Sequence, residues 1–350
     1  MPAHLPSPVA TLSPGVFAMV MATGIIAVAS SQQGIDWLAD ALYVVAAVMY
    51  VVLLPTLVAR IIRYPAAFTA DVTSPRKGFA FLTTVAGTNV LAAASALLHG
   101  WWALAWALWW FALGLWPVFL YITLIAVVIG DDKPGLEQGI NGTWFLLTVA
   151  TESIAVVAGL LLTRGDNNLL AFTAMAAFTL GLVLYLMVMT AELLRWILRR
   201  LDPTDLDPSA WISAGAMAIT VLAGSNLLLA ASASQALAQL TQFLHATVIL
   251  AWATATFWLP MLVGLGVWRH IVRRVPLACT SAYWALVFPI GMYGAATSSM
   301  LDVIQVGRLG WLPQVTLVAA LVAWLLTFMG LLHHLARSWR DRRVGGVPAP

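Results

Sequence analysis

Charged side chains are scarce in this sequence: aspartate, glutamate, lysine and arginine together make up 9% of its 350 residues. A soluble domain usually carries about 25% charged residues, which keep its surface hydrated. Hydrophobic residues reach 62% here, against about 45–50% in a soluble domain. A chain of this composition cannot cover its apolar surface in water. The sequence therefore excludes a soluble globular protein and indicates an integral membrane protein.

Cysteine is also nearly absent, since Cys279 is the single one in the chain. One thiol cannot form an internal disulfide framework or a cysteine-rich metal site, and we interpret Cys279 as an inert apolar side chain. The sequence contains no recognisable histidine and acidic metal-binding cluster, phosphate-binding loop, nucleophile–base set or nucleic-acid-binding module. It therefore predicts no enzyme activity, no metal, no cofactor and no nucleic-acid partner.

Apolar runs of about 20 residues, the length that crosses a bilayer as a helix, follow one another almost from end to end. Short polar breaks separate them, such as the turn cluster Gly130–Gly135 and the helix-starting pair Asp207-Pro208. We predict ten transmembrane helices: Pro14–Ser31, Leu38–Ile62, Phe79–Leu98, Ala103–Ile129, Thr143–Leu162, Leu169–Ala191, Ser209–Ala231, Phe243–Val267, Ala282–Leu301 and Pro313–Leu335. The predicted fold class is all-α integral membrane. Residues 14–336 form one transmembrane domain, preceded by a short segment 1–13 and followed by a basic tail 337–350.

The basic residues predict the orientation of these helices. Fifteen of the 17 lysines and arginines follow even-numbered helices, and only Arg164 and Arg308 follow odd-numbered ones. The positive-inside rule then places both termini in the cytoplasm, as an even number of spans requires. The first 15 residues contain no lysine or arginine, so they lack the basic region of a secretory signal and we expect a retained first helix. The tryptophans cluster toward helix ends, as at Trp101-Trp102 and Trp109-Trp110, which suits an aromatic belt at the headgroups.

A triplet of a small residue, a hydroxyl residue and a variable residue recurs in every odd-numbered helix. The copies are Ala22-Thr23-Gly24, Gly87-Thr88-Asn89, Ala150-Thr151-Glu152, Gly224-Ser225-Asn226 and Ala296-Thr297-Ser298. Their hydroxyl residues are 65, 63, 74 and 72 residues apart, the length of two helices, which indicates a helical hairpin repeated five times. The even-numbered helices are rich in leucine, valine and tryptophan, so we expect them to face lipid and the odd-numbered helices to form an inner ring.

An inner ring of this kind predicts a pore. We expect its wall to carry the five repeated hydroxyls, which suit a partly dehydrated ion, and the two asparagines of the same triplets. These residues are Thr23, Thr88, Asn89, Thr151, Ser225, Asn226 and Thr297. The alternative is that small residues and hydroxyls let neighbouring helices pack closely and hydrogen-bond across their interface. Packing alone does not restrict the pattern to alternate helices, so we favour the pore.

Glu152 is an acidic residue about ten residues into the fifth predicted helix. An ionised carboxylate at such a depth costs about 2.5–3.5 kcal/mol on insertion scales, so it has to be paired, solvated or protonated. If Glu152 exchanges a proton with either side, it can couple proton flux to an anion, which makes it a candidate proton-coupling residue. The alternative is a protonated glutamate that is hydrogen-bonded to a neighbouring helix.

Four segments resemble the tellurite-resistance/dicarboxylate transporter family, which includes the plant slow-type anion channels and the yeast malate and sulfite carriers. They are FAMVMATGI in the first helix, SPRKGFAFLTTVAGTNVL entering the third, TWFLLTVATESIAV in the fifth and YWALVFP in the ninth. The resemblance covers most of the chain and implies five hairpins around a central pore, often assembled as a homotrimer. It also implies a gate, because a phenylalanine of the ninth helix blocks the pore in channel members, and Phe288 matches it here.

Pro289 follows Phe288 directly and removes a helix hydrogen bond, so we expect the ninth helix to kink there and push Phe288 toward the pore axis. The sequence thus predicts a multi-pass plasma-membrane channel or transporter for small inorganic or organic acid anions, gated by Phe288 and Pro289. Sulfite, nitrate, chloride and malate are all open as substrates, and so is a role in tellurite resistance. The alternative function is a proton-coupled carrier of a dicarboxylate or of sulfite that uses Glu152.

Overall fold

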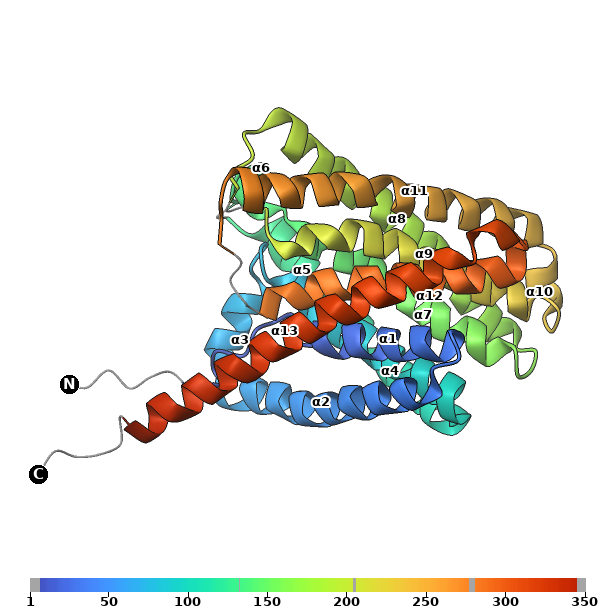
Figure 1. The fold of residues 1–350 in the computed structure, drawn as a ribbon, viewed down its shortest axis with the longest axis horizontal. Helices are drawn as coiled ribbons and strands as arrows, with labels where there is room; N and C mark the ends of the chain where they lie inside the picture. Colours follow the sequence, from blue (N-terminus) through green and yellow to red (C-terminus); the bar gives the residue numbers. More distant parts are fainter. Residues whose placement is uncertain (1–6, 132, 204–205, 277–280, 345–350) are drawn as a thin grey trace, which may run out of the picture.

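The computed structural model describes residues 7–131, 133–203, 206–276 and 281–344. Cys279 lies outside these residues. The described chain is folded into helices joined by turns and contains no β-strand (Figure 1), so the predicted all-α membrane fold is confirmed. Within it, nine helical segments are long and apolar enough to cross a membrane. The first helix, α1, has the same apolar character but is shorter, with 15 residues.

Five helices form a closed inner ring. They are α1 (Ala18–Gln32), α4 (Thr83–His99), α7 (Leu146–Leu162), α9 (Ile212–Ala230) and α12 (Trp284–Ile304). Each packs against the next in this order, and α12 packs against α1. Four of them begin with a turn of 3-10 helix: η1 (Gly78–Leu82), η2 (Gly142–Phe145), η3 (Pro208–Trp211) and η5 (Ser281–Tyr283).

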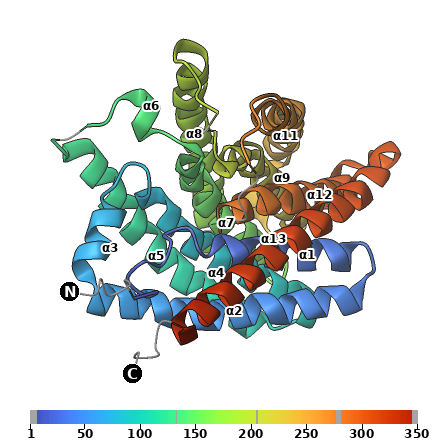
Figure 2. The ribbon, with the colours of Figure 1, turned by 60° about the vertical axis from the view of Figure 1, so that its left-hand side comes forward.

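Five longer helices surround this ring and alternate with the inner ones along the chain. They are α2 (Asp36–Arg63), α5 (Trp102–Ile129), α8 (Asn168–Leu198), α11 (Thr241–Val267), which continues as the π-helix Trp268–Val272, and α13 (Trp311–Val344). The spanning windows of these outer helices are 17–33% buried, against 67–100% for the long inner segments. Figure 2 shows α7 and α9 between α8 and α11 on one side and α2 on the other. Odd-numbered spans are therefore inside and even-numbered spans outside, as the repeat predicts.

All five inner helices run in the same direction, because each is followed by an outer helix that returns the chain. The two ends of the described chain and the short helices α3 (Pro65–Val72) and α6 (Leu136–Gly139) lie at the end where the inner helices begin, and α10 (Gln235–Ala238) lies at the other (Figure 1). The first end carries Arg60, Arg63, Arg76, Lys77, Lys133, Arg195, Arg199, Arg200, Arg269, Arg273, Arg274 and Arg337. We call it the basic end and the opposite one the far end. That the basic end faces the cytoplasm stays a prediction.

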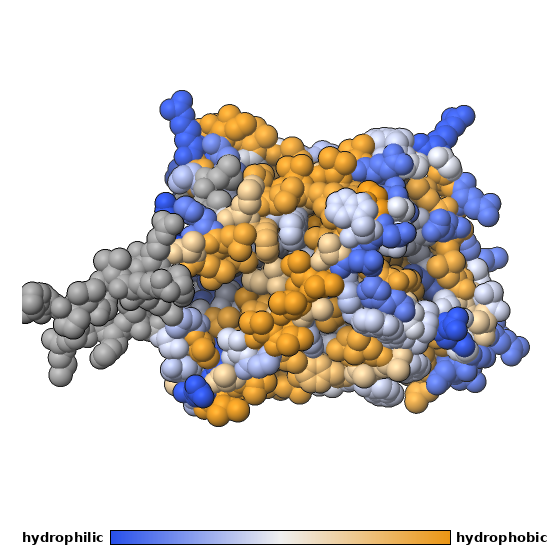
Figure 3. Space-filling view, turned by 60° about the horizontal axis from the view of Figure 1, so that its bottom comes forward, coloured by the Kyte–Doolittle hydropathy of each residue, from blue (hydrophilic) through white to orange (hydrophobic). Residues whose placement is uncertain are grey.

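The surface has the character of a membrane protein. Figure 3 shows hydrophobic side chains across the middle of one face and hydrophilic side chains mostly toward its two ends. Outer-helix residues such as Val51, Phe172 and Leu326 are 60–72% exposed, which is expected of side chains that contact lipid rather than water. A multi-pass membrane protein is thus what the structure shows.

The helix ends follow local sequence signals, but two outer helices extend beyond their predicted ends. One is α13, which continues to Val344 through most of the segment 337–350 that the sequence predicts as a basic tail. The other is α8. Asn167 accepts a hydrogen bond from the Leu170 N–H at 3.0 Å and starts α8, as an asparagine N-cap does. The sequence predicts the end of this span near Ala191, but α8 continues to Leu198. The extra turns are stabilised because Arg195, one turn after Glu192, donates to its carboxylate at 3.0 Å, and both side chains are buried.

Candidate functional site

The basic end of the inner ring contains a cavity of about 240 Å3, which we call the basic-end vestibule. Every inner helix, or the turn that precedes it, contributes to its wall. The lining includes Pro14, Met21, Arg76, Lys77, Thr83, Leu146, Asp207, Ile212, Ala285 and Phe288. A cavity that is shared by all five inner helices lies on the axis of the ring.

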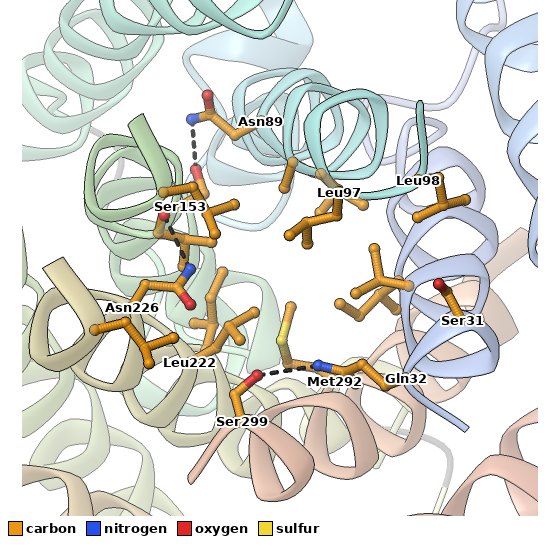
Figure 4. Close-up of a pocket in the computed structure, with 18 of the residues that line it drawn as sticks. Ser31, Gln32, Asn89, Leu97, Leu98, Ser153, Leu222, Asn226, Met292 and Ser299 are labelled. Carbon is orange, nitrogen blue, oxygen red and sulfur yellow. Dashed lines mark hydrogen bonds between the residues drawn. The ribbon is translucent and has the colours of Figure 1, made fainter. Parts of the chain in front are cut away.

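The far end of the same ring contains a second cavity, of about 260 Å3, which we call the far-end vestibule (Figure 4). All five inner helices line it, and each contributes at least one polar side chain: Gln32, Asn89, Ser153, Asn226 and Asp302. Apolar side chains such as Val90, Leu222 and Met292 fill the rest of the wall. The two asparagines of the repeated triplets therefore lie on the wall of an axial cavity.

Hydrogen bonds hold the polar side chains of the far-end vestibule in place (Figure 4). Asn89 Nδ2 donates to Ser153 Oγ at 2.9 Å, and Asn226 Nδ2 donates to the Val156 carbonyl at 3.1 Å. Gln32 Nε2 donates to Ser299 Oγ at 3.0 Å. These bonds join α4 and α9 to α7 and join α1 to α12, so the wall is a fixed arrangement of amide and hydroxyl groups.

A thin apolar layer separates the two vestibules. Phe288 and Met21 line the basic-end vestibule, whereas Met292 and Ile25, one turn further along the same two helices, line the far-end vestibule. Four residues of α-helix span about 6 Å. Phe288 is 2% exposed and so fills its place in this layer. A constriction of apolar side chains excludes a hydrated ion, so the path along the axis is closed here.

Pro289 helps to place Phe288, although not through a break in the helix. α12 is one helix from Trp284 to Ile304 with Pro289 inside it, so the proline does not end the helix, and the kink that the sequence predicts there stays a prediction. Pro289 has no N–H to offer the Ala285 carbonyl, which is left without its usual helical partner. The proline ring instead packs against Gly215 of α9, where a Cβ atom would lie 2.9 Å from Pro289 Cγ. This close packing fixes α12 and Phe288 against the ring.

The repeated hydroxyls lie at the interface between the two rings, which differs from the predicted pore wall. In four of the five repeats an aromatic side chain of an outer helix forms a hydrogen bond with the hydroxyl. Trp324 Nε1 donates to Thr23 at 2.9 Å, Trp116 Nε1 donates to Thr151 at 2.9 Å and Trp252 Nε1 donates to Thr297 at 3.2 Å. The Tyr50 hydroxyl forms a hydrogen bond with the Thr88 hydroxyl at 2.9 Å. A buried indole or phenol needs a hydrogen-bond partner in an apolar interface. The packing alternative therefore describes these four residues, and Ser225 is buried on α9 without lining either vestibule.

Glu152 occupies the interface between α7, α8 and α9 and lines neither vestibule. Its side chain is fully buried, and its carboxyl group packs against Gly181 of α8, which leaves the room for it. The Thr220 hydroxyl lies 3.2 Å from Glu152 Oε1 and 2.9 Å from the Ala216 carbonyl. The Thr220 hydroxyl therefore joins Glu152 to the backbone of α9. The structure thus places the proton-coupling candidate away from the axis.

An ion-pair cluster shapes the charge at the basic end. Asp71 of α3 accepts a hydrogen bond from Lys77 Nζ at 2.9 Å and forms a second ion pair with Arg60. Burial acts to raise the pKa of Asp71, but the hydrogen bonds and charges of Arg60 and Lys77 outweigh it and lower that pKa below its ordinary value. Asp71 therefore offsets part of the Lys77 charge at the vestibule. Arg76, whose backbone carbonyl accepts from Asn141 Nδ2 at 3.1 Å, belongs to a fixed segment.

Comparisons with known proteins identify the family. A family model described as voltage-dependent anion channel matches residues 11–332. Two uncharacterized transporters of Methanocaldococcus jannaschii are 22% and 23% identical to this chain, over 80% and 81% of its length and 82% of theirs. An uncharacterized membrane protein of Mycobacterium tuberculosis is 36% identical over 175 residues, which are 47% of this chain and 85% of that protein. The family match extends from the turn before α1 into α13, and the chain therefore belongs to the voltage-dependent anion channel family, a family of membrane proteins that transport anions.

Proposed function

We propose that the protein is a conduit for small anions along the axis of the inner ring, closed at Phe288. The observation that carries the proposal is the pair of vestibules on opposite sides of this side chain, each lined by all five inner helices. An axial path needs only the apolar layer between them to open. In this proposal the basic end faces the cytoplasm of a cell whose plasma membrane the bundle crosses, and assembly as a homotrimer stays a prediction from the resemblance.

The direction of the inner helices supports an anion as the transported species. All five begin at the basic end, and the amino-terminal end of a helix carries a partial positive charge of roughly half an elementary charge. Arg76 and Lys77 line the same vestibule and outnumber its one acidic lining residue, Asp207, although Asp71 pairs with Lys77. Helix ends and basic side chains together favour anions in front of Phe288.

The lining of the far-end vestibule supports a small and weakly held anion. Its polar groups are amides, hydroxyls and one carboxyl group, and no lysine or arginine of the described chain belongs to it. Conduction requires binding that is weak enough for the ion to leave, and neutral groups meet that requirement better than a fixed cation. Chloride, nitrate, sulfite and the anions of small organic acids are therefore the proposed substrates.

The position of Glu152, which lines neither vestibule, supports a conduit rather than a proton-coupled carrier. We expect anion uptake into liposomes with the reconstituted protein to follow the anion gradient and to be indifferent to an imposed pH gradient. We also expect Glu152→Gln to keep this uptake, because glutamine retains a hydrogen-bonding group beside Thr220 and the residue is off the axis. The measurement is uptake of chloride, nitrate, sulfite and malate with and without a pH gradient, against protein-free liposomes. Uptake that needs the pH gradient and disappears in Glu152→Gln would establish the carrier instead.

A further inference from the structure

The two vestibules differ in the charged side chains that face them. Arg76, Lys77 and Asp207 line the basic-end vestibule. In the far-end vestibule Asp302 is the one charged residue of the lining, as far as the chain is described. It stands in the last turn of α12, one turn beyond Ser299, and is exposed. An acidic side chain at the mouth of an anion conduit is unexpected, because rings of lysine and arginine are the usual choice for anion pores.

The carboxylate of Asp302 has no ion-pair partner within 4.0 Å among the described residues. It also takes part in no side-chain hydrogen bond among them. The guanidinium of Arg164, a basic residue of the same end, lies over the Trp102 ring at 5.1 Å from its centroid. Arg164 and Arg308, the two basic residues in the far-end loops, belong to neither vestibule lining. The carboxylate therefore acts on whatever occupies the vestibule mouth.

The ends of the inner helices add to the negative electrostatic potential that Asp302 creates at the far mouth. All five inner helices finish at the far end, and the carboxyl-terminal end of a helix carries a partial negative charge. An anion that crosses the far mouth in either direction is repelled by these ends and by Asp302. The repulsion energy is proportional to the charge of the anion, so it doubles from a singly to a doubly charged one.

We infer that Asp302 is a charge filter at the far mouth of the conduit, which selects singly charged anions over doubly charged ones. The inference rests on the proposed conduit and narrows its substrates to monovalent inorganic anions and monoanionic organic acids. Fully ionised dicarboxylates and sulfate are then poor substrates. Asp302 acts through its charge alone, without holding the anion, and this distinguishes it from a binding residue.

The test is Asp302→Asn in a Phe288→Ala background, with chloride and sulfate flux measured in liposomes. The substitution keeps the shape of an exposed side chain and removes its charge. For a carboxylate about 8 Å from the ion in water, we expect removal of its charge to raise chloride flux about twofold and sulfate flux about fourfold. The repulsion energy of sulfate is twice that of chloride, so the increase in sulfate flux is the square of the increase in chloride flux. Both factors should approach one at about 1 M salt, where the Debye length is about 3 Å.

Asp166→Asn is the matched control, since Asp166 is exposed at the far end and lines neither vestibule. We expect it to leave the sulfate-to-chloride flux ratio unchanged. Equal factors for the two anions in Asp302→Asn, no change at all, or the same change in Asp166→Asn would overturn the filter. Absence of flux in the Phe288→Ala background would overturn the conduit and the filter together. If flux is present but Asp302→Asn leaves the sulfate-to-chloride flux ratio unchanged, the filter alone is overturned.

Discussion

Replacing Phe288 by alanine is expected to raise anion flux through the reconstituted protein at least about tenfold, which corresponds to about 1.4 kcal/mol off the barrier. The phenyl ring is 2% exposed and separates two vestibules that are one helical turn apart. Its removal leaves a passage in a layer that otherwise consists of apolar side chains such as Met21 and Met292. The measurement is chloride efflux from liposomes with the variant or the wild type at equal protein content.

The control for this experiment is Phe145→Ala. Phe145 is also fully buried at the start of an inner helix, but it packs outward on Tyr185 of α8, with ring centroids 5.6 Å apart, and lines neither vestibule. Both substitutions remove a buried phenylalanine and should cost about 3–5 kcal/mol of stability. We expect only Phe288→Ala to raise flux. If both variants leak equally, the flux reports loosened packing, and if neither leaks, Phe288 does not close the path.

Gly142→Ala is expected to cause the largest loss of stability among single-methyl additions, about 3 kcal/mol or more. A Cβ atom on Gly142 would overlap the backbone carbonyl of Ser209 and lie 2.6 Å from the Ala210 nitrogen. Main-chain atoms cannot rotate away as a flexible side chain does, so η2 and η3 have to separate. Since η3 and Asp207 form part of the basic-end vestibule, the change should also alter transport. Thermal unfolding in detergent measures the effect.

Gly114→Ala is the matched control for this prediction. Gly114 lies within α5, and a Cβ atom there meets nothing within 4 Å. Alanine also has the higher helix propensity, so we expect a change of at most about 0.5 kcal/mol. Equal unfolding temperatures for Gly142→Ala and the wild type would show that the close approach of η2 and η3 does not stabilise the fold.

Much of the architecture is predictable from the sequence because a bilayer demands long apolar helices. Each of the ten predicted spans overlaps one observed helix, and the alternation of inner and outer helices follows the hairpin repeat. The end of α8 is less predictable, since Glu192 and Arg195 are typical of a cytoplasmic loop. They remain in the helix because each neutralises the other at 3.0 Å.

The direction of side chains on the inner helices is not predictable in the same way. An amphipathic helix shows its buried face, but an inner helix such as α7 is apolar and buried all round. The sequence of α7 therefore does not show which of its side chains face the axis of the ring and which face the outer helices. The triplet repeat identifies equivalent positions, and the structure shows that the hydroxyl faces the outer ring while the asparagine after it, in Asn89 and Asn226, faces the axis.

The tryptophans show the same limit of sequence reasoning. Trp116, Trp252 and Trp324 lie within outer helices and donate to inner hydroxyls, rather than lying at the headgroups as the sequence predicts for this residue type. The signal that identifies them is their position in the middle of a span. The burial of Glu152 also depends on a residue in another helix. Gly181 of α8 has no side chain, and the carboxyl group of Glu152 fills the space beside it.

The most direct test of the central claim is the reactivity of introduced cysteines with a small anionic thiol reagent that cannot cross the membrane. In a Cys279→Ser background, Ala285→Cys places a thiol in the basic-end vestibule and Ala93→Cys places one in the far-end vestibule. We predict that each reacts from its own side only, and that adding Phe288→Ala lets both react from both sides. Reaction of Ala93→Cys from both sides while Phe288 is intact, or no change when Phe288 is removed, would contradict an axial path closed at this residue.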